Sequence, residues 1–297
     1  MRGLRHFLAI ALALLAGACG SADNRKPATP PARVALWEIT DASGPRAWIM
    51  GTVHALPEGT KWRSAAIDRA VAASDRIVFE IGQELNDQIG SAALARLAFT
   101  QGLPPPSQRI APGYRADLSK VYKQLDIGDD TFANEESWAV ALQIGAIAGK
   151  KEGIDPENGV EPELRKMAGD KPIEGLETID SQFAIFDRLA NSDQTVLLEQ
   201  VAHEAASSDD EDGDVMKMWL RGDTEGIDRE SRSGFLADAG LREALLTGRN
   251  VRWANQLDRM LQGGARPFVA VGASHVSGDD GLPALLARHG WTVRRIQ

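Results

Sequence analysis

The chain of 297 residues contains a single cysteine, Cys19, so no disulfide can form within it and metal sites built from several thiolates are excluded. Basic residues are also scarce, because 33 Lys and Arg stand against 42 Asp and Glu and give a formal net charge of −9. Neutralisation of phosphates dominates affinity for nucleic acids, and we therefore expect no nucleic-acid partner. The sequence also lacks a Walker loop, a Rossmann glycine fingerprint and a G-x-S-x-G elbow. Any metal bound here must use histidine and carboxylate ligands.

The first 18 residues predict a secretory signal. Two arginines precede an apolar run over residues 7–15, which is too short to span a bilayer as a mature helix. Cys19 follows at the cleavage point, in a context that resembles a bacterial lipobox. We therefore expect lipidation of Cys19 and an anchor in the bacterial envelope, with the protein facing the periplasm. Glycine at position 20 favours the outer membrane over the inner one, and plain secretion with cleavage near Ala18 is the alternative.

The segment after the cysteine has the composition of a tether. Residues 20–33 are polar, include Pro-Pro and show no periodicity. We therefore expect residues 19–33 to form a lipidated cysteine with a flexible tether, and residues 34–297 to form a single folded domain.

Both ends of this domain predict the same order of strand, G-x-x-H loop, helix and strand. Because such βαβ units imply parallel strand pairs, we predict an α/β fold with two βαβ-type halves around a central sheet. A largely helical insert lies between the halves. The expected strands are 34–40 and 46–50 (a hairpin), 77–81, 171–176, 267–271 and 291–296. The expected helices are 63–74, 86–100, 107–125, 134–150, 162–168, 179–190, 193–206, 214–221, 237–262 and 282–289.

Chemistry-bearing side chains follow the expected parallel strands. His54 and His275 each end a G-x-x-H motif, and Glu80 ends the strand after the first helix. The carboxyl ends of parallel strands carry the sites of such sheets, so two units side by side would bring these three residues together. Two imidazoles and a carboxylate with open positions are typical of a metal-hydrolase site. The alternative is that each histidine is a hydrogen-bonded loop residue.

The other histidines of the mature chain have plainer contexts. His203 falls in a helical stretch beside an acidic residue, and His289 ends the last expected helix. We interpret both as surface or helix-cap residues.

An ordered set of motifs along residues 34–297 resembles the TraB/GumN family, which includes the TraB and PrgY pheromone-shutdown proteins and the Tiki proteases. The motifs are Trp37-Glu38-Ile39, Gly51-Thr-Val-His54-Ala-Leu-Pro57, Ser74-Asp75 with Ile-Val-Phe-Glu80-Ile, Gly153-Ile-Asp155, Lys171-Pro-Ile-Glu-Gly-Leu-Glu177-Thr with Gln182, Arg249-Asn250, and Val271-Gly-Ala-Ser-His275-Val-Ser-Gly-Asp-Asp-Gly281-Leu. One departure is Ser274, where the family usually has glycine before the second histidine.

The resemblance implies a fold related to erythromycin esterase and to the haem-binding ChaN lipoproteins. It implies metal-dependent proteolysis, with His54, His275 and Glu80 at the site. The Arg-Asn pair of the family maps to Arg249 and Asn250, and Arg249 would hold a carboxylate or stabilise a developing oxyanion. The alternative is that the two are a surface pair on the expected helix 237–262. Two further matching positions, Asp155 and Glu177, are expected to orient site residues or to serve the structure.

Together these features predict an envelope-anchored, metal-dependent hydrolase, in particular a peptidase acting on a peptide or protein substrate of the envelope. Glu80 would be either the third ligand or the general base. Because imidazole is a borderline ligand, Mn²⁺, Co²⁺ or Zn²⁺ is expected rather than Mg²⁺. Two alternatives stay open. One is a ChaN-like lipoprotein that binds haem or iron through one histidine. The other is a non-catalytic accessory protein of exopolysaccharide or envelope assembly.

Overall fold

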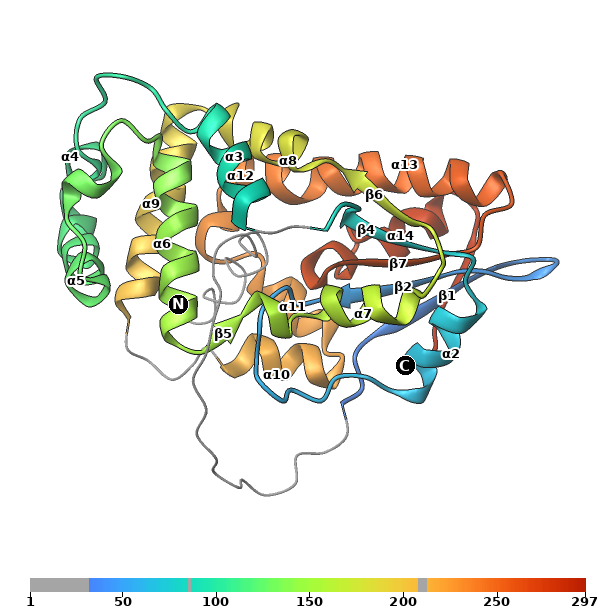
Figure 1. Ribbon diagram of the computed structural model, residues 1–297. Helices are drawn as coiled ribbons and strands as arrows, with labels where there is room; N and C mark the ends of the chain where they lie inside the picture. Colours follow the sequence, from blue (N-terminus) through green and yellow to red (C-terminus); the bar gives the residue numbers. More distant parts are fainter. Residues whose placement is uncertain (1–31, 85–86, 208–212) are drawn as a thin grey trace.

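The computed structural model describes residues 32–84, 87–207 and 213–297, in which helices enclose a six-stranded sheet (Figure 1). The expected signal, Cys19 and residues 20–31 of the tether lie outside these ranges. Among the described helices, none combines the length and the hydrophobicity needed to cross a bilayer.

The sheet has the mixed α/β character that the sequence predicts. Its central strands β6, β4, β7 and β2 are parallel neighbours, whereas β1 pairs antiparallel with β2 on one side and with β8 on the other. The expected hairpin at the start of the domain is therefore confirmed as β1–β2. In sheet order the strands are β6 (Ile173–Glu177), β4 (Arg76–Ile81), β7 (Pro267–Gly272), β2 (Gly44–Thr52), β1 (Leu36–Asp41) and β8 (Thr292–Arg295).

The two βαβ units are interleaved in the sheet rather than placed one beside the other. Phe268 of β7 pairs with Trp48 of β2 on one side and with Ile77 of β4 on the other. The connection from β2 to β4 through α2 (Ala65–Ala73) therefore passes over β7. The connection from β7 to β8 through α14 (Leu282–Arg288) passes over β2 and β1.

Helices cover both faces of the sheet because side chains alternate along each buried strand. On β4, Ile77 and Phe79 join the apolar core that includes α2 and α7 (Val160–Ala168). Val78, between them, joins a second core with α13 (Gly248–Gln262) and α14. Figure 1 shows α13 above the sheet and α2 and α7 below it.

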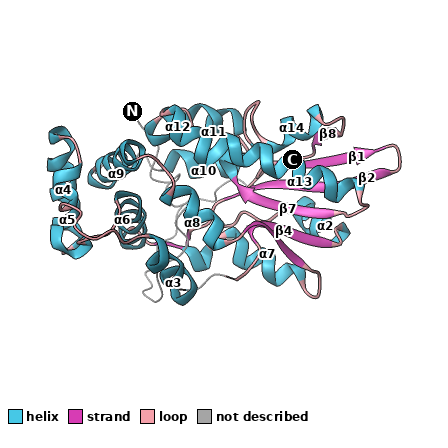
Figure 2. Cartoon of the chain, turned by 90° about the horizontal axis from the view of Figure 1, so that it is seen from above, coloured by secondary structure: helices cyan, strands magenta, loops and turns pink. Residues whose placement is uncertain are grey.

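The remaining helices gather beyond the carboxyl ends of the parallel strands. Figure 2 shows α4, α5, α6 and α9 as a block at the end of the molecule away from the tip of the β1–β2 hairpin. A short ribbon of β3 (Leu56–Pro57) and β5 (Ile154–Asp155) links this part to the sheet. The helices are α3 (Asp87–Leu97), α4 (Pro106–Arg109), α5 (Arg115–Leu125), α6 (Ser137–Lys151), α8 (Ile179–Asp187), α9 (Asn191–Ala206), α10 (Gly213–Arg221), α11 (Thr224–Glu230) and α12 (Ala239–Arg242).

Two of the long helices expected from the sequence are interrupted. The helix expected over 107–125 stops after Arg109, because Ala111 precedes a proline and takes an extended conformation with ψ 146°. The helix expected over 237–262 contains a π-turn at Glu243–Thr247, in which the N–H of Gly248 donates to the carbonyl of Glu243. Such turns shift the register of a helix by one residue and occur often at functional sites.

Candidate functional site

Both G-x-x-H motifs leave the sheet at the same level. Thr52, at the end of β2, pairs with Gly272, at the end of β7, so the loops that carry the two histidines start side by side. Gly51 permits their close packing, because a Cβ atom there would lie 2.9 Å from Cα of Ala273 in the second motif. The glycine of the first motif thus makes room for the turn of the second.

Glu80 of β4 lies between the two histidines. Its Oε1 atom is 3.9 Å from Nε2 of His54 and 3.8 Å from Nε2 of His275. The same oxygen accepts a 2.7 Å hydrogen bond from the backbone N–H of Gly272, which fixes it at the end of β7. The interleaved strand order places these three side chains together, since β7 separates β2 from β4.

Each histidine is held through its other ring nitrogen. Nδ1 of His54 lies 2.7 Å from Oε1 of Glu161, an oxygen that also accepts a 2.6 Å hydrogen bond from Thr52. Nδ1 of His275 lies 2.5 Å from Oδ1 of Asn250, whose amide nitrogen donates to the carbonyl of Asp280. Since an amide oxygen only accepts, the proton of His275 sits on Nδ1 and its Nε2 carries a lone pair.

Arg249 of α13 closes the network on the buried side. Its Nη2 donates to Oε2 of Glu80 over 2.8 Å and to Oε2 of Glu177 over 2.9 Å. Its Nη1 lies 3.3 Å from Nε2 of His275 and donates to the carbonyl of Leu245 in the π-turn. The guanidinium also stacks over the ring of Trp253, with 4.5 Å to the ring centroid. One cation thus links two carboxylates and a neutral imidazole.

The ionisation of the site follows from this arrangement. Burial would raise the pKa of Glu80, but the positive charge of Arg249 and the other groups around the carboxylate together lower the pKa to about 2. Burial would lower the pKa of His54, but the charge and hydrogen bond of Glu161 raise it to about 9. Burial lowers the pKa of His275 to about 3, despite the opposite effect of Glu80. At neutral pH, His54 is therefore protonated and His275 is neutral, and both lie beside the carboxylate of Glu80.

Access to the site is from the side of His54. The side chains of His54 and Glu161 are 13% and 18% exposed, whereas that of His275 is 4% exposed. A ligand reaching the site meets His54 first.

The structure brings together most of the residues that the sequence singled out: His54, Glu80, Glu177, Arg249, Asn250 and His275. Asp155 lies apart from them, where it pairs with Leu56 across the β3–β5 ribbon and accepts a hydrogen bond from the N–H of Glu157. His203 pairs with Asp117 between α9 and α5, and His289 lies near Asp258, so neither takes part in the site.

Sequence reasoning missed Glu161. It stands in the first turn of α7 directly after Gly159 and Val160. Acidic residues are common in that position because they complement the helix dipole, so the sequence pattern alone does not mark this one. The one feature of the sequence that could have indicated Glu161 is its position two residues after Gly159, the glycine at which the preceding loop ends and α7 begins.

The donor atoms fit a small divalent metal with limited movement. Two imidazole Nε2 atoms and one carboxylate oxygen are the ligands that Zn²⁺, Mn²⁺ and Co²⁺ accept. Ligand atoms in a tetrahedral zinc site lie about 3.4 Å apart, given bonds of ~2.1 Å, so the separations of 3.8 and 3.9 Å need a small contraction. Within the described ranges no group of three or more His, Cys, Asp or Glu side chains is already arranged as a metal site. Nη1 of Arg249 would also have to withdraw from His275, and His54 would have to release the proton on Nε2 that its raised pKa implies.

Comparison with known proteins gives one match. The sequence pattern of the TraB/PrgY/gumN family matches residues 35–295, which is most of the chain. The searches of curated proteins and of solved structures give no significant match. The matched range includes both G-x-x-H motifs, Glu80 and the Arg249–Asn250 pair, and the chain therefore belongs to the TraB/PrgY/gumN family.

Proposed function

We propose that the chain is a metal-dependent hydrolase of the cell envelope that acts on peptide bonds. The observation that carries this proposal is the convergence of two Nε2 atoms, from His54 and His275, on Oε1 of Glu80. Residues that hold the opposite ring nitrogens support it, because metal-binding histidines usually bond through their second nitrogen to a carboxylate or another acceptor.

The donor set assigns a part to each group. His54, His275 and Oε1 of Glu80 would hold the metal, and Oε2 of Glu80 stays bonded to Arg249 and 3.3 Å from the amide of Gln182. A divalent metal bound there would act as a Lewis acid and supply a nucleophile at neutral pH. The position of Oε1 between the imidazoles favours the ligand role of Glu80 over the role of general base.

Arg249 and Glu161 would orient the residues that bind the metal. Arg249 keeps Glu80 ionised and fixes the direction of its second oxygen, while Glu161 sets the ring orientation of His54. Arg249 also supplies positive charge at the site for a developing oxyanion. These roles need both side chains in place before a substrate arrives, which agrees with the hydrogen bonds that hold them.

We further propose that a lipid on Cys19 anchors the protein in the outer membrane, where the folded domain faces the periplasm. Its peptide or protein substrate would then share that compartment. Mass spectrometry of the N-terminal peptide from producing cells tests this point, since lipidation replaces the free thiol and adds the mass of acyl chains.

The first test of the metal site is metal content by inductively coupled plasma mass spectrometry. The full chain is purified without chelators or histidine tags, and Mn²⁺, Co²⁺ and Zn²⁺ are offered in turn. We expect about one metal per chain, lost in the double variant His54→Ala/His275→Ala and kept in the control His203→Ala. No metal in the wild-type protein with any of the three ions would overturn the proposal, and haem absorbance in a haem-loaded sample would replace it with the haem-binding alternative.

A further inference from the structure

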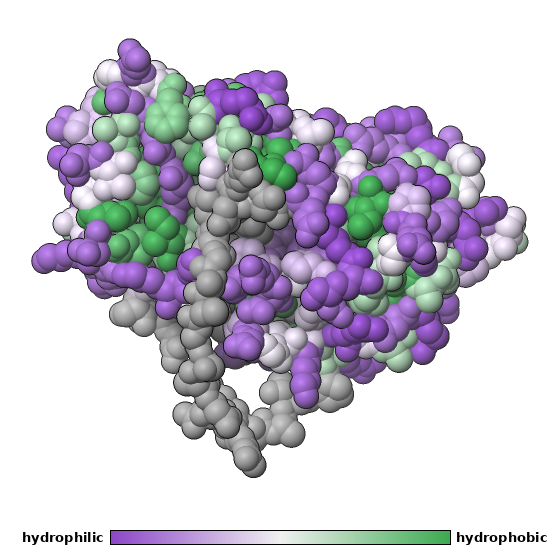
Figure 3. Space-filling model, in the orientation of Figure 1, coloured by the Kyte–Doolittle hydropathy of each residue, from purple (hydrophilic) through white to green (hydrophobic). Residues whose placement is uncertain are grey.

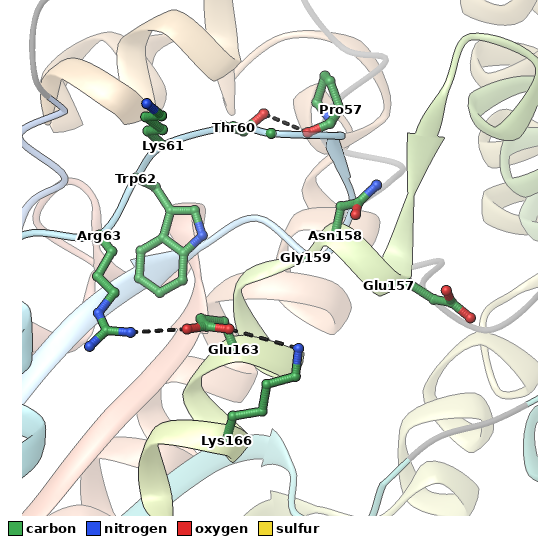
Figure 4. A pocket seen from close by; sticks show the side chains of 11 residues that line it. Pro57, Thr60, Lys61, Trp62, Arg63, Glu157, Asn158, Gly159, Glu163 and Lys166 are labelled. Atoms are coloured by element: carbon green, nitrogen blue, oxygen red, sulfur yellow. Dashed lines mark hydrogen bonds and ion pairs between the residues drawn. The ribbon is translucent and has the colours of Figure 1, made fainter. Parts of the chain in front are cut away.

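An open cavity of about 480 Å³ lies beside the candidate site (Figure 4). One wall is the loop of residues 57–63, which continues the chain after His54, and the other is the start of α7 with the turn before it. The volume falls within the range of ligand pockets, about 300–1,000 Å³. The lining is largely polar, so the cavity suits a hydrated polar group rather than an apolar molecule.

The cavity borders the backbone that carries the first site histidine. A Cβ atom on Gly159, a lining residue, would lie 2.0 Å from the carbonyl oxygen of His54. The next N–H, of Val160, donates to the carbonyl of Val53 over 3.1 Å. On α7, Glu161 contacts His54 while Glu163 lines the cavity. A ligand in the cavity is therefore separated from His54 only by the first turn of α7.

Two lysines at one end of the cavity are weakly compensated by acidic side chains. Arg63 pairs with two carboxylates, Asp68 at 2.5 Å and Glu163 at 3.0 Å, whereas Lys166 lies 3.8 Å from Glu163. Lys61 also lines the cavity and has no acidic partner within the described part of the chain. Figure 4 shows the carboxylate of Glu157, the other acid of the lining, pointing away from these cations. Lys61 and Lys166 are therefore the cations of the lining that have no acidic partner closer than 3.8 Å among the described residues.

We propose that this cavity is a subsite for a carboxylate-bearing stretch of a polypeptide substrate, held by Lys61 and Lys166. The identity of the ligand as a polypeptide rests on the proposed function, whereas the preference for a carboxylate rests on the lining alone. The carboxylate belongs either to an acidic side chain or to the C-terminus of the peptide. The ring of Trp62 lies between the two walls, where it is 5% exposed and packs against Trp219 (Figure 4).

Peptide binding tests this subsite without requiring catalysis. Pentapeptides with an uncharged BODIPY label are titrated with the full chain in the presence of EDTA, and fluorescence anisotropy gives the Kd. The first pair of peptides has Glu or Gln at the central position with an amidated C-terminus. The second pair has Gln there, with a free or an amidated C-terminus. We expect the carboxylate form of one pair to bind at least tenfold more tightly than its neutral counterpart, and the pair that shows it identifies the source of the carboxylate.

Matched variants link that preference to the cavity. Lys61→Gln and Lys166→Gln each remove a cation at the rim, and we expect each to reduce the preference by about threefold to fivefold, as for ion pairs at exposed positions. Lys120→Gln, on the exposed surface of α5, should leave it unchanged. Equal binding of charged and neutral peptides, or an unchanged preference in Lys61→Gln/Lys166→Gln, would overturn the proposal. Because EDTA is present, a failed metal site with a retained preference refutes the hydrolase and leaves the subsite intact.

Discussion

Arg249 and Glu80, 169 positions apart in the sequence, form a hydrogen-bonded ion pair of 2.8 Å in which both side chains are less than a tenth exposed. The pair links α13 to the central strand β4, and Glu177 on β6 joins it from the far side. Removing one member of a buried pair leaves the other charge without compensation, which costs more than the pair contributes.

The first prediction is that Arg249→Met lowers the free energy of unfolding by about 3–5 kcal/mol, since Glu80 and Glu177 lose their shared cation. Arg252→Met is the control, because its side chain lies on the same helix and is 57% exposed. Urea denaturation followed by circular dichroism measures both. An equal loss of unfolding free energy in the two variants would show that the buried pair does not stabilise the fold more than an exposed arginine does.

The second prediction concerns Glu161, which holds Nδ1 of His54. Glu161→Gln removes the negative charge from this contact while keeping the size of the side chain, and we expect metal affinity to fall by about 10–100-fold. Titration with Co²⁺, followed by its visible absorption, gives the affinity. Asp170→Asn, at an exposed position after α7, should bind as the wild type does. Wild-type Co²⁺ affinity in the Glu161→Gln variant would show that the charge of Glu161 plays no part in metal binding.

The third prediction compares two glycines. Gly159→Ala places a Cβ atom against the carbonyl of His54 and should destabilise the protein by about 1–3 kcal/mol. Gly149→Ala, inside α6, meets nothing within 4 Å and should stabilise the helix by about 0.5–1 kcal/mol. Thermal unfolding of both variants tests the opposite signs, and a stabilising Gly159→Ala would show that the loop of His54 moves freely away from α7.

The fourth prediction concerns the hydroxyl groups of the second motif. Ser274 is buried and its Oγ has no hydrogen-bond partner among the described residues, so Ser274→Ala should raise stability by about 1 kcal/mol. Ser277, three residues on, donates to the carbonyl of Ala273 over 2.8 Å, so Ser277→Ala should lower stability by about the same amount. Guanidinium denaturation distinguishes the two, and a destabilised Ser274→Ala variant would point to a partner for this hydroxyl.

The sequence predicts those parts of the site that depend on local pattern. β-rich runs ending in G-x-x-H place His54 and His275 at the carboxyl ends of strands, and the short run before Glu80 does the same. Arg249 and Asn250 lie on a helix that is polar over much of its surface, so only the resemblance to a family singles them out. Glu161 looks like an ordinary residue of a first helical turn, and its contact with His54 depends on how α7 packs.

The order of the strands also lies beyond the local pattern. Each strand shows its apolar residues, but nothing in them states that β7 enters between β2 and β4. That choice depends on the path of the crossover helices and on packing over more than 200 residues. The breaks at Ala111 and at Glu243–Thr247 have the same origin, since periodicity continues across them while the backbone changes its hydrogen bonds.

The central position of β7 has a consequence for the way the chain folds. Residues 267–272 are made after nine tenths of the polypeptide, yet β2 and β4 have no direct pairing with each other and depend on this strand to join them. A nascent chain that stops short of β7 therefore has two unpaired strand edges where the sheet should be continuous. Such long-range pairing makes folding slow and exposes edges to aggregation. The sheet is therefore continuous, and the two site histidines lie together, only once β7 is in place between β2 and β4.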